Sequence, residues 1–448
     1  PMFMTLIVLF CFIFVVFGQI EYHHCHHKVE FGKQNTFPIL DGHKTQKLIK
    51  TVKNGKLYHV TVPQSGANSS NTFNLIHVWG SPFERGEAQG QLLGSRITDF
   101  LSNVWTYLEG QVSGAIKSKV SLPKWLLKDI ADVGLDAALD ATALATRPWT
   151  GKYFFEELHG LCAGAGASGS GCYNTALRIH MIAGLTQGHC SLFGSWGKAS
   201  AKGHTLQLRA LDWNMDGPFR DDAAVTVYHA QHANENSFAM VGMGGFVGAL
   251  TGVSDKQVGI SEIGVSYPDG TFGAQSRFGI PFIFLLRDIL QFDQTLDDAV
   301  SRMADTRRTC DLILGVGDAK LGYVRGIEYS DSVLDVMDDY NMRPTNDTWH
   351  FKIPEMVYWG MDWLCPGYTQ VLGTQLKKHW GKLTPEIAIR DVMAVEMSGD
   401  VHIAVYDLTQ NELFVSFAAP HGTDGPQKAY ARQYTRFSTT QLFAEPKP

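Results

Sequence analysis

The pattern of apolar residues along the chain changes character close to Cys190. From residue 75 to about residue 188 most apolar side chains recur at helical spacing, which predicts one strand followed by a series of amphipathic helices. After Cys190 the chain runs in short, β-branched or aromatic stretches bounded by Gly, Asn or Asp, such as HTLQLRALDW and AAVTVYHAQ. Such stretches are typical of strands, so a mostly helical part precedes a part dominated by sheet.

Helices and strands also follow one another in blocks further along the chain. A helical pair, FIFLLRDILQF and TLDDAVSRMADT, precedes strands near DLILGVGD and LGYVRGIEYS, and a helix at TPEIAIRDVMAVE precedes two closing strands. Blocks of this kind favour packed layers of sheet and helix over alternating βαβ units. The expected fold class is therefore α+β.

The length and charge of the chain narrow the classes of function. With 448 residues, 44% of them hydrophobic, it can bury the core of one large domain or of two ordinary ones. The formal net charge is -6, only 18% of the residues are charged, and the lysines and arginines are scattered. This distribution does not favour a nucleic acid partner.

The chain begins with an almost unbroken apolar run from Met2 to Phe17, followed at once by the polar sequence QIEYHHCHHK. This is typical of a signal peptide, and we expect residues 1–18 to be removed, although a run of this length is also compatible with a membrane anchor. Residues 20–72 are polar and predict a peripheral hairpin or an extended arm. The HHCHH cluster has no partner pair at structural-zinc spacing, so we expect neither a metal site nor a cofactor.

Two glycosylation acceptor sequences, at Asn68 and Asn346, agree with a secretory route. Together with the leader they predict a secreted or lysosomal glycoprotein. Six of the seven cysteines remain once the leader is gone, and in an oxidising compartment they are expected to form disulfides.

A free cysteine among those six would leave an odd number for pairing. The arrangement we favour joins Cys162 to Cys172 and Cys310 to Cys365 and leaves Cys25 alone. Cys25 is equally able to pair with Cys310 or Cys365, because spacing does not determine connectivity.

Cys190 stands where the helical pattern gives way to the sheet pattern, in GLTQGHCSLFGSWG. A lone cysteine is more often a buried structural residue than a nucleophile. The next strand, however, ends in LRALDWNMDG and brings Arg209, Asp212 and Asn214 close together. A cation near a thiol favours the thiolate, and a carboxylate can orient an amine, so these residue types suit nucleophilic chemistry.

The strand that carries Arg209 and Asp212 places a condition on a shared site. Residues three apart in a regular strand point to opposite faces, so we expect the strand to bend or end near Ala210 if both side chains act on Cys190.

The order of these segments resembles the group formed by choloylglycine hydrolase, penicillin acyltransferase and acid ceramidase. A Cys at the start of a strand followed by Arg-x-x-Asp matches that group, GSPFERGEAQGQLL resembles its glycine-rich entry segment, and EELHGLCAGAG resembles the segment before its nucleophile. The similarity extends over about residues 75–420 and is greatest to acid-ceramidase-like and acyltransferase-like members of protists and animals.

The resemblance implies a four-layer αββα sandwich of the N-terminal-nucleophile type. It implies that the chain cuts itself between His189 and Cys190, giving fragments 19–189 and 190–448 that stay together. The freed α-amino group of Cys190 would then take the proton from its own thiol. By the same resemblance Arg209 lies beside the thiolate and Asp212 hydrogen-bonds the α-amino group.

The oxyanion hole departs from the pattern of the group. Relatives supply an Asn at the end of the strand that here reads VGISEIGVSYP, which contains none. Ser266 or Asn214 are candidates to replace it, and Asn341 and Arg343 are candidates for a further Asn and Arg of the group. Loss of one oxyanion donor costs about two to three orders of magnitude in rate, so this departure bears directly on activity.

The expected function is hydrolysis of N-acyl amides, for example N-acyl lipids such as ceramide, through a Cys190 thioester. Three alternatives stay open: acyl transfer to an amine, a catalytically silent binding protein with the same fold, and a papain-like pair of Cys190 with His402. Expected partners are a small-molecule or lipid substrate, with transient contact to a membrane surface. Aromatic residues in FKIPEMVYWGMDWLCPGY would either line an acyl pocket or, more commonly, pack in the core.

Overall fold

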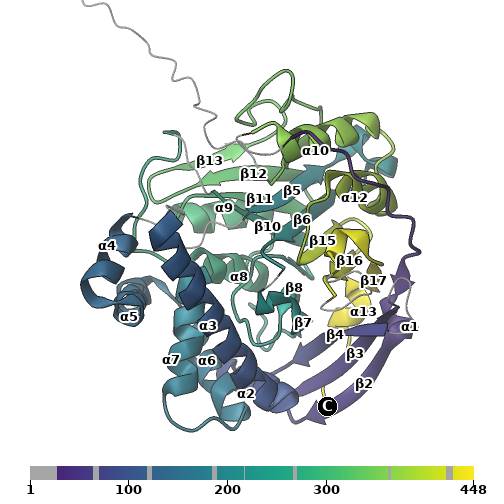
Figure 1. Ribbon diagram of the computed structural model, residues 1–448. Helices are drawn as coiled ribbons and strands as arrows, with labels where there is room; N and C mark the ends of the chain where they lie inside the picture. Colours follow the sequence, from purple (N-terminus) through teal and green to yellow (C-terminus); the bar gives the residue numbers. More distant parts are fainter. Residues whose placement is uncertain are drawn as a thin grey trace, which may run out of the picture.

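A computed structural model describes residues 28–63, 70–118, 124–183, 189–215, 217–265, 270–361, 365–419 and 427–448 (Figure 1). The expectations for the leader at residues 1–18, for the HHCHH cluster with Cys25, and for Asn68 and Ser266 fall outside these ranges. None of the helices in the described part of the chain combines the length and the apolar character needed to cross a bilayer.

One sheet holds seven strands, antiparallel except where β1 pairs with β17. Its order is β1 (Leu40–Asp41), β17 (Thr435–Ser438), β16 (Glu412–Phe417), β15 (His402–Asp407), β6 (Leu206–Asp212), β5 (His189–Ser195) and β14 (Met356–Trp359). Strands β5 and β6 are thus internal strands of this sheet.

The second sheet holds ten strands, antiparallel except where β4 pairs with β7. Its order is β13 (Leu334–Met337), β12 (Tyr323–Tyr329), β11 (Leu312–Asp318), β10 (Val258–Gly264), β9 (Gly252–Ser254), β8 (Phe238–Met243), β7 (Ala223–Tyr228), β4 (Ser70–Val78), β3 (Gly55–Pro63) and β2 (Gln46–Val52). The polar N-terminal region therefore does form a hairpin, β2–β3, at the edge of this sheet.

The two sheets pack face to face through apolar side chains such as Leu192, Ile313 and Val324. A Cβ on Gly194 would come within 2.4 Å of Val324, so this glycine permits the close approach of β5 to the other sheet. Many strands are buried on both faces, which explains why their sequences run apolar without strict alternation.

One helical layer covers the outer face of the ten-stranded sheet (Figure 1). It consists of α2 (Pro82–Leu93), α3 (Ser95–Ser118), α4 (Lys124–Val133), α5 (Leu135–Thr146), α6 (Lys152–Gly164), α7 (Gly171–Ala183), α8 (Phe282–Phe292) and α9 (Leu296–Asp305). Helices α2 and α6 cross at glycines: a Cβ on Gly86 or Gly90 would lie about 2 Å from a carbonyl oxygen of α6. The glycine-rich segments of the sequence thus form a closely packed helix pair.

A smaller helical layer covers the outer face of the seven-stranded sheet. It consists of α10 (Gly367–Lys378) and a second helical stretch formed by α11 (Pro385–Ile387), η5 (Ala388–Met393) and α12 (Ala394–Glu396). The short elements α1 (Gly42–Thr45), α13 (Thr439–Phe443), η1 (Arg147–Trp149), η2 (Gly197–Ala199), η3 (Ala201–Gly203), η4 (Pro218–Arg220) and η6 (Ala429–Ala431) connect the layers. The α+β, four-layer αββα prediction is confirmed.

The disulfide predictions have a mixed outcome. Cys162 and Cys172 are bonded, with a Cα–Cα distance of 5.8 Å, and join α6 to α7. The prediction of a Cys310–Cys365 bond is wrong, because Cys310 is a free thiol in the core beneath the first helical layer. Cys365 is disulfide-bonded and lies just before α10, in the other helical layer.

The aromatic segment before α10 belongs to the core. Tyr358 and Trp359 lie on β14 with no exposed surface. Tyr358 packs against α10 at Gly373, and Trp359 packs between the sheets against Gly326 of β12. The core interpretation of these two residues is confirmed.

Candidate active site

Cys190 is the second residue of β5, between β6 and β14. The ladder sets Cys190 opposite Leu211 and Leu192 opposite Arg209. Because side chains alternate along a strand, the thiol and the guanidinium share the face that is directed at the ten-stranded sheet. The Cys190 side chain is buried there, at 1% exposure.

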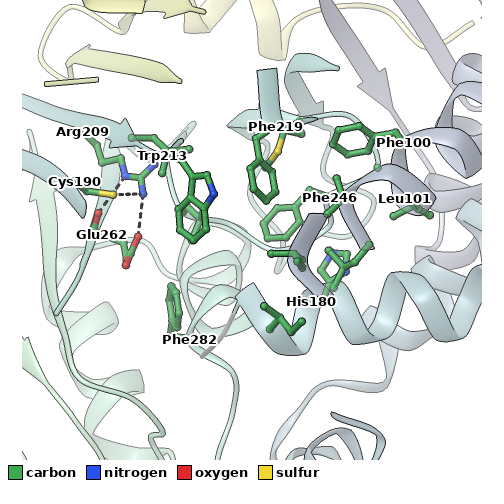
Figure 2. A pocket seen from close by; sticks show the side chains of 18 residues that line it. Phe100, Leu101, His180, Cys190, Arg209, Trp213, Phe219, Phe246, Glu262 and Phe282 are labelled. Atoms are coloured by element: carbon green, nitrogen blue, oxygen red, sulfur yellow. Dashed lines mark hydrogen bonds and ion pairs between the residues drawn. The ribbon is translucent and has the colours of Figure 1, made fainter. Parts of the chain in front are cut away.

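Arg209 is fully buried and its guanidinium connects the thiol to the facing sheet (Figure 2). Nη2 donates to Cys190 Sγ at 3.2 Å and to the Glu262 carboxylate at 3.0 Å, while Nε donates to the Glu262 carbonyl oxygen at 3.1 Å. Nη1 lies 3.3 Å from His402 Nε2. These contacts from β5, β10 and β15 fix the guanidinium beside the sulfur.

The electrostatic balance at the thiol favours its protonated form in the uncut chain. Burial raises the pKa of Cys190 to about 12; Arg209 opposes this increase, and the carboxylates of Glu262 and Asp212 add to it. Burial also raises the pKa of Glu262, against the lowering effect of Arg209. A further base is therefore needed before the sulfur can act as a nucleophile.

His402 does not supply that base. Burial, reinforced by Arg209, lowers its pKa well below the usual range, so the ring is neutral. Its Nε2 lies 3.2 Å from Thr251 Oγ1 and 3.3 Å from Arg209, and no contact with the sulfur is found among the described residues. The papain-like alternative thus has no geometric support, and the histidine holds Arg209 in place.

Asp212 lies at the end of β6, opposite His189 in the ladder. The strand does not bend at Ala210, so the Asp212 carboxylate points to the other face of the sheet. There it accepts hydrogen bonds from the main-chain N–H groups of Gly399 at 2.7 Å and Asp400 at 2.9 Å. The thiol and this carboxylate therefore flank the start of β5 from opposite faces.

The Asp212 carboxylate is also the end of a buried chain of oxygen atoms. Glu396 Oε1 contacts Ser191 Oγ at 2.7 Å, Ser191 Oγ contacts Ser398 Oγ at 2.7 Å, and Ser398 Oγ contacts Asp212. Three such contacts require three protons, but two hydroxyls supply only two. One of the two carboxyls must therefore be protonated.

The pKa of Asp212 agrees with the presence of a proton on one of these two carboxyl groups. Burial raises it to about 7, Asp400 adds to the increase, and the hydrogen bonds from Ser398, Gly399 and Asp400 oppose it. Below about pH 7 the Asp212 carboxyl thus carries a proton, at a position opposite His189 in the ladder.

An apolar pocket extends away from the thiol and encloses about 830 Å³, its open mouth included. Figure 2 shows Cys190, Arg209 and Glu262 at one end, Trp213 and Phe282 beyond them, and Phe100, Leu101 and His180 at the far end. His180 is neutral, because burial lowers its pKa to about 4 and its ring contacts main-chain atoms of Ala176 and Val247. Apart from the group around the thiol, the lining is suited to a hydrocarbon chain.

The structure does not bring the other candidate residues to the thiol. Asn214 is exposed after β6, Asn341 hydrogen-bonds within its own turn to Val336 and Asp338, and Arg343 pairs with Glu328 and Asp335. Asn346 caps the turn that contains Thr348, and whether it carries a glycan stays a prediction.

Glu262 and the pocket residues were not assigned a role from the sequence. Glu262 is the only ionisable residue in the strand VGISEIG, which is a signal that it has a specific partner. The pocket residues come from α3, α7, α8 and the segments after β6 and β8, so their proximity depends on the tertiary fold.

Comparison with solved structures finds partial overlaps. The Caenorhabditis elegans N-acylethanolamine-hydrolyzing acid amidase ortholog is 14% identical, over 55% of this chain and 98% of that chain, with a TM-score of 0.36. Penicillin V acylase from Agrobacterium tumefaciens is 13% identical, over 58% and 89%, with a TM-score of 0.39. Conjugated bile acid hydrolase from Clostridium perfringens is 10% identical, over 56% and 93%, with a TM-score of 0.33.

No protein-family model matches the chain. Two Dictyostelium discoideum proteins match it over most of its length. Protein dcd1A is 34% identical over 429 residues, which cover 92% of this chain and 93% of dcd1A. Protein dcd1B is 34% identical over 428 residues, which cover 92% of this chain and 81% of dcd1B. The chain belongs to the family of dcd1A and dcd1B.

Proposed function

We propose that this protein is a self-cleaving cysteine amidohydrolase of the N-terminal-nucleophile type, acting on amides with an apolar acyl chain. One observation carries the proposal: the Cys190 thiol closes the polar end of an otherwise apolar pocket, with a buried arginine donating to its sulfur. A structural cysteine needs neither the cation nor the pocket.

The pocket supports the substrate class. An acyl chain lying along Trp213, Phe219 and Phe246 would bring its carbonyl carbon to the sulfur, while the amine portion would remain near the polar group of Arg209 and Glu262. Burying each methylene contributes about 0.8 kcal/mol, so affinity should increase with chain length until the pocket is filled. N-acyl lipids such as ceramide belong to this class of amides.

Cleavage of the chain before Cys190 would begin with the sulfur. Attack of Cys190 Sγ on the His189 carbonyl carbon forms a C–S bond, and the C–N bond then breaks with the amine as leaving group. That nitrogen takes up a proton, for which the Asp212 carboxyl, opposite His189 in the ladder, is the proposed donor. The proton that the thiol loses returns through solvent to the Asp212 carboxylate, so one proton moves in total from sulfur to nitrogen. Water hydrolyses the resulting ester of the thiol and leaves a free α-amino group on Cys190.

In the cleaved enzyme the α-amino group would act as the base that the uncut chain lacks. Its ordinary pKa of about 7.7 to 8 suits removal of the thiol proton near neutral pH. The thiolate attacks the substrate carbonyl, the amine leaves with a proton from the α-ammonium group, and water resolves the thioester. Arg209 stabilises negative charge on the sulfur, and Glu262 holds Arg209 in position.

The fold supports continued association of the two fragments after cleavage. Strands β3 and β4, from the fragment 19–189, lie in the ten-stranded sheet, where β4 pairs with β7 of the fragment 190–448. Location in a lysosome or outside the cell remains part of the proposal, and the Cys162–Cys172 disulfide is a bond that such oxidising compartments preserve.

A silent binding protein is the second candidate, and the protonated thiol of the uncut chain favours it. The two are separated by incubating acidified protein with N-acyl amides of increasing chain length and measuring the acid released. We expect release that increases with chain length and is lost in Cys190→Ser. Binding of the amides without release, equal in wild type and variant, would favour the binding protein, and transfer to an added amine would identify an acyltransferase.

A further inference from the structure

A second cavity lies near the ends of the two sheets, with β3 and β4 on one side and β16 on the other. Unlike the apolar pocket it is mainly polar, and Arg96, Arg220 and Arg432 all line it. The η4 turn separates the two cavities, because Phe219 lines the apolar pocket and Arg220 lines the polar one. The proposed hydrolase reaction makes no use of this polar cavity.

Arg432 is the unusual member of the arginine group. It is only 6% exposed, its Nη1 donates to the Phe417 carbonyl oxygen, and its Nη2 has no hydrogen-bond partner. Burial lowers its pKa to about 10, and among the described residues no carboxylate contributes to this pKa or accepts from Nη2. A buried, uncompensated guanidinium is costly, so a ligand that supplies the missing charge would stabilise it.

The other buried arginines of the described chain show the usual arrangement. Arg85 pairs with Glu235 at 2.7 Å, Arg209 with Glu262 at 3.0 Å, and Arg287 with Glu157 at 2.5 Å. Arg432 alone among these buried arginines faces a cavity in place of a carboxylate. The difference points to an exchangeable anion.

The remaining charges around the cavity indicate a single negative charge. Arg96 pairs with Asp222, and Arg220 lies 3.5 Å from Asp221, so these two cations are each balanced. Arg432 contributes the positive charge that is left over. Asn71, which also lines the cavity, has a buried side-chain N–H group without a partner.

We propose that this cavity binds an oxyanion of the phosphate type, with Arg432 as its main ligand and Arg220 and Asn71 as supporting donors. Guanidinium and amide N–H groups are the donors that phosphate oxygens accept most effectively. The phosphate group belongs either to a free anion or to a lipid headgroup, since the same donors serve both.

The test uses the full chain and measures thermal unfolding and equilibrium binding with inorganic phosphate, against sodium chloride at the same ionic strength. We expect a phosphate-specific increase in the unfolding midpoint, because a ligand that binds only the folded state stabilises it. Arg432→Gln should weaken phosphate binding by about tenfold or more. Without phosphate, the same variant should be no less stable than wild type, which a merely structural arginine would not allow.

The control variant is Arg436→Gln, an exposed arginine that lines a different groove and pairs with Glu412 at 3.3 Å. It should bind phosphate as wild type does. Arg220→Gln, at a partly exposed position, tests the site independently if Arg432→Gln does not fold.

A second arm measures sedimentation with phosphatidylcholine vesicles, with and without phosphatidic acid. Phosphate binding that is lost in Arg432→Gln identifies a free oxyanion, and vesicle binding that needs phosphatidic acid and Arg432 identifies a headgroup. The proposal is overturned if neither ligand binds, or if binding is unchanged in both Arg432→Gln and Arg220→Gln.

Discussion

Two cysteines in the described chain, Cys190 and Cys310, are free and buried, but the groups that surround their sulfur atoms differ. Cys310 lies in the core under the first helical layer, where its sulfur contacts the Thr309 hydroxyl at 3.6 Å. Cys190 has Arg209 Nη2 at 3.2 Å and an apolar pocket beside it. Burial raises the pKa of both thiols, so burial alone does not distinguish a nucleophile from a core residue.

The distinguishing features lie outside the cysteine itself. A cation at the sulfur, an apolar pocket beside it and a buried series of hydrogen-bonded carboxyl and hydroxyl groups behind the start of the strand occur together only at Cys190 among the two free thiols of the described chain. We infer that activity arises from these neighbours acting with the amine that cleavage would release.

Replacing each cysteine by alanine should have the largest and most unequal effect. Cys190→Ala should abolish chain cleavage and reduce amide hydrolysis by at least about a thousandfold, because the nucleophile is lost. Cys310→Ala should leave both within about twofold and lower stability by about 1 kcal/mol. Gel mobility, hydrolysis rate and urea unfolding measure these outcomes, and equal losses of activity in the two variants would contradict the comparison.

Changing Arg209 should have the next largest effect. Arg209→Met with Glu262→Leu removes the ion pair without leaving a buried charge, so folding should survive while hydrolysis decreases by about a hundredfold or more. Arg287 and Glu157 form an equally buried pair in the helical layer and provide the matched control. Their replacement by Met and Leu should change stability but leave the hydrolysis rate nearly unaltered, and an equal loss of rate would assign Arg209 a structural role only.

Asp212 should make the uncut chain less stable as pH rises. Its pKa is raised from 3.8 to about 7, so between these values the folded chain binds more protons than the unfolded chain. The contribution is therefore fully present below about pH 4 and decreases by up to about 1.4 kcal/mol per pH unit until pH 7. Urea unfolding of Cys190→Ala, which should remain uncut, measures this slope. Adding Asp212→Asn should flatten it, and an unchanged slope would remove Asp212 as the proton holder.

Shortening the apolar pocket should have the smallest effect. Leu101 lies at the end of the pocket away from the thiol, so Leu101→Trp should weaken hydrolysis of long-chain amides by about tenfold and spare short ones. Steady-state kinetics with a series of chain lengths measures the change. A uniform decrease at every length would indicate that the acyl chain does not occupy this pocket.

The layered fold was predictable from the sequence because the helical and strand patterns occupy separate blocks. Strand β14 was not predictable, because its sequence MVYW is short and lies in an aromatic segment where apolar and polar residues do not alternate. The disulfide pattern was only half predictable, because Cys310 and Cys365 are placed in different layers by contacts distant in sequence.

At the site, the placement of Arg209 beside Cys190 was implied by the resemblance, and the antiparallel pairing of β5 with β6 accounts for it in the structure. The role of Glu262 was not predictable, because its pairing with Arg209 crosses between the two sheets. The hydrogen-bonded series from Asp212 to Glu396 was not predictable either, because it joins β6 to α12 through two hydroxyl groups from other segments.

The most direct test of the account is the intact mass and N-terminal sequence of the mature, acidified protein. We predict two fragments that remain associated, the larger beginning at Cys190 with a free α-amino group. A single uncut chain after acidification, or a Cys190 sulfur occupied by a disulfide, would contradict it.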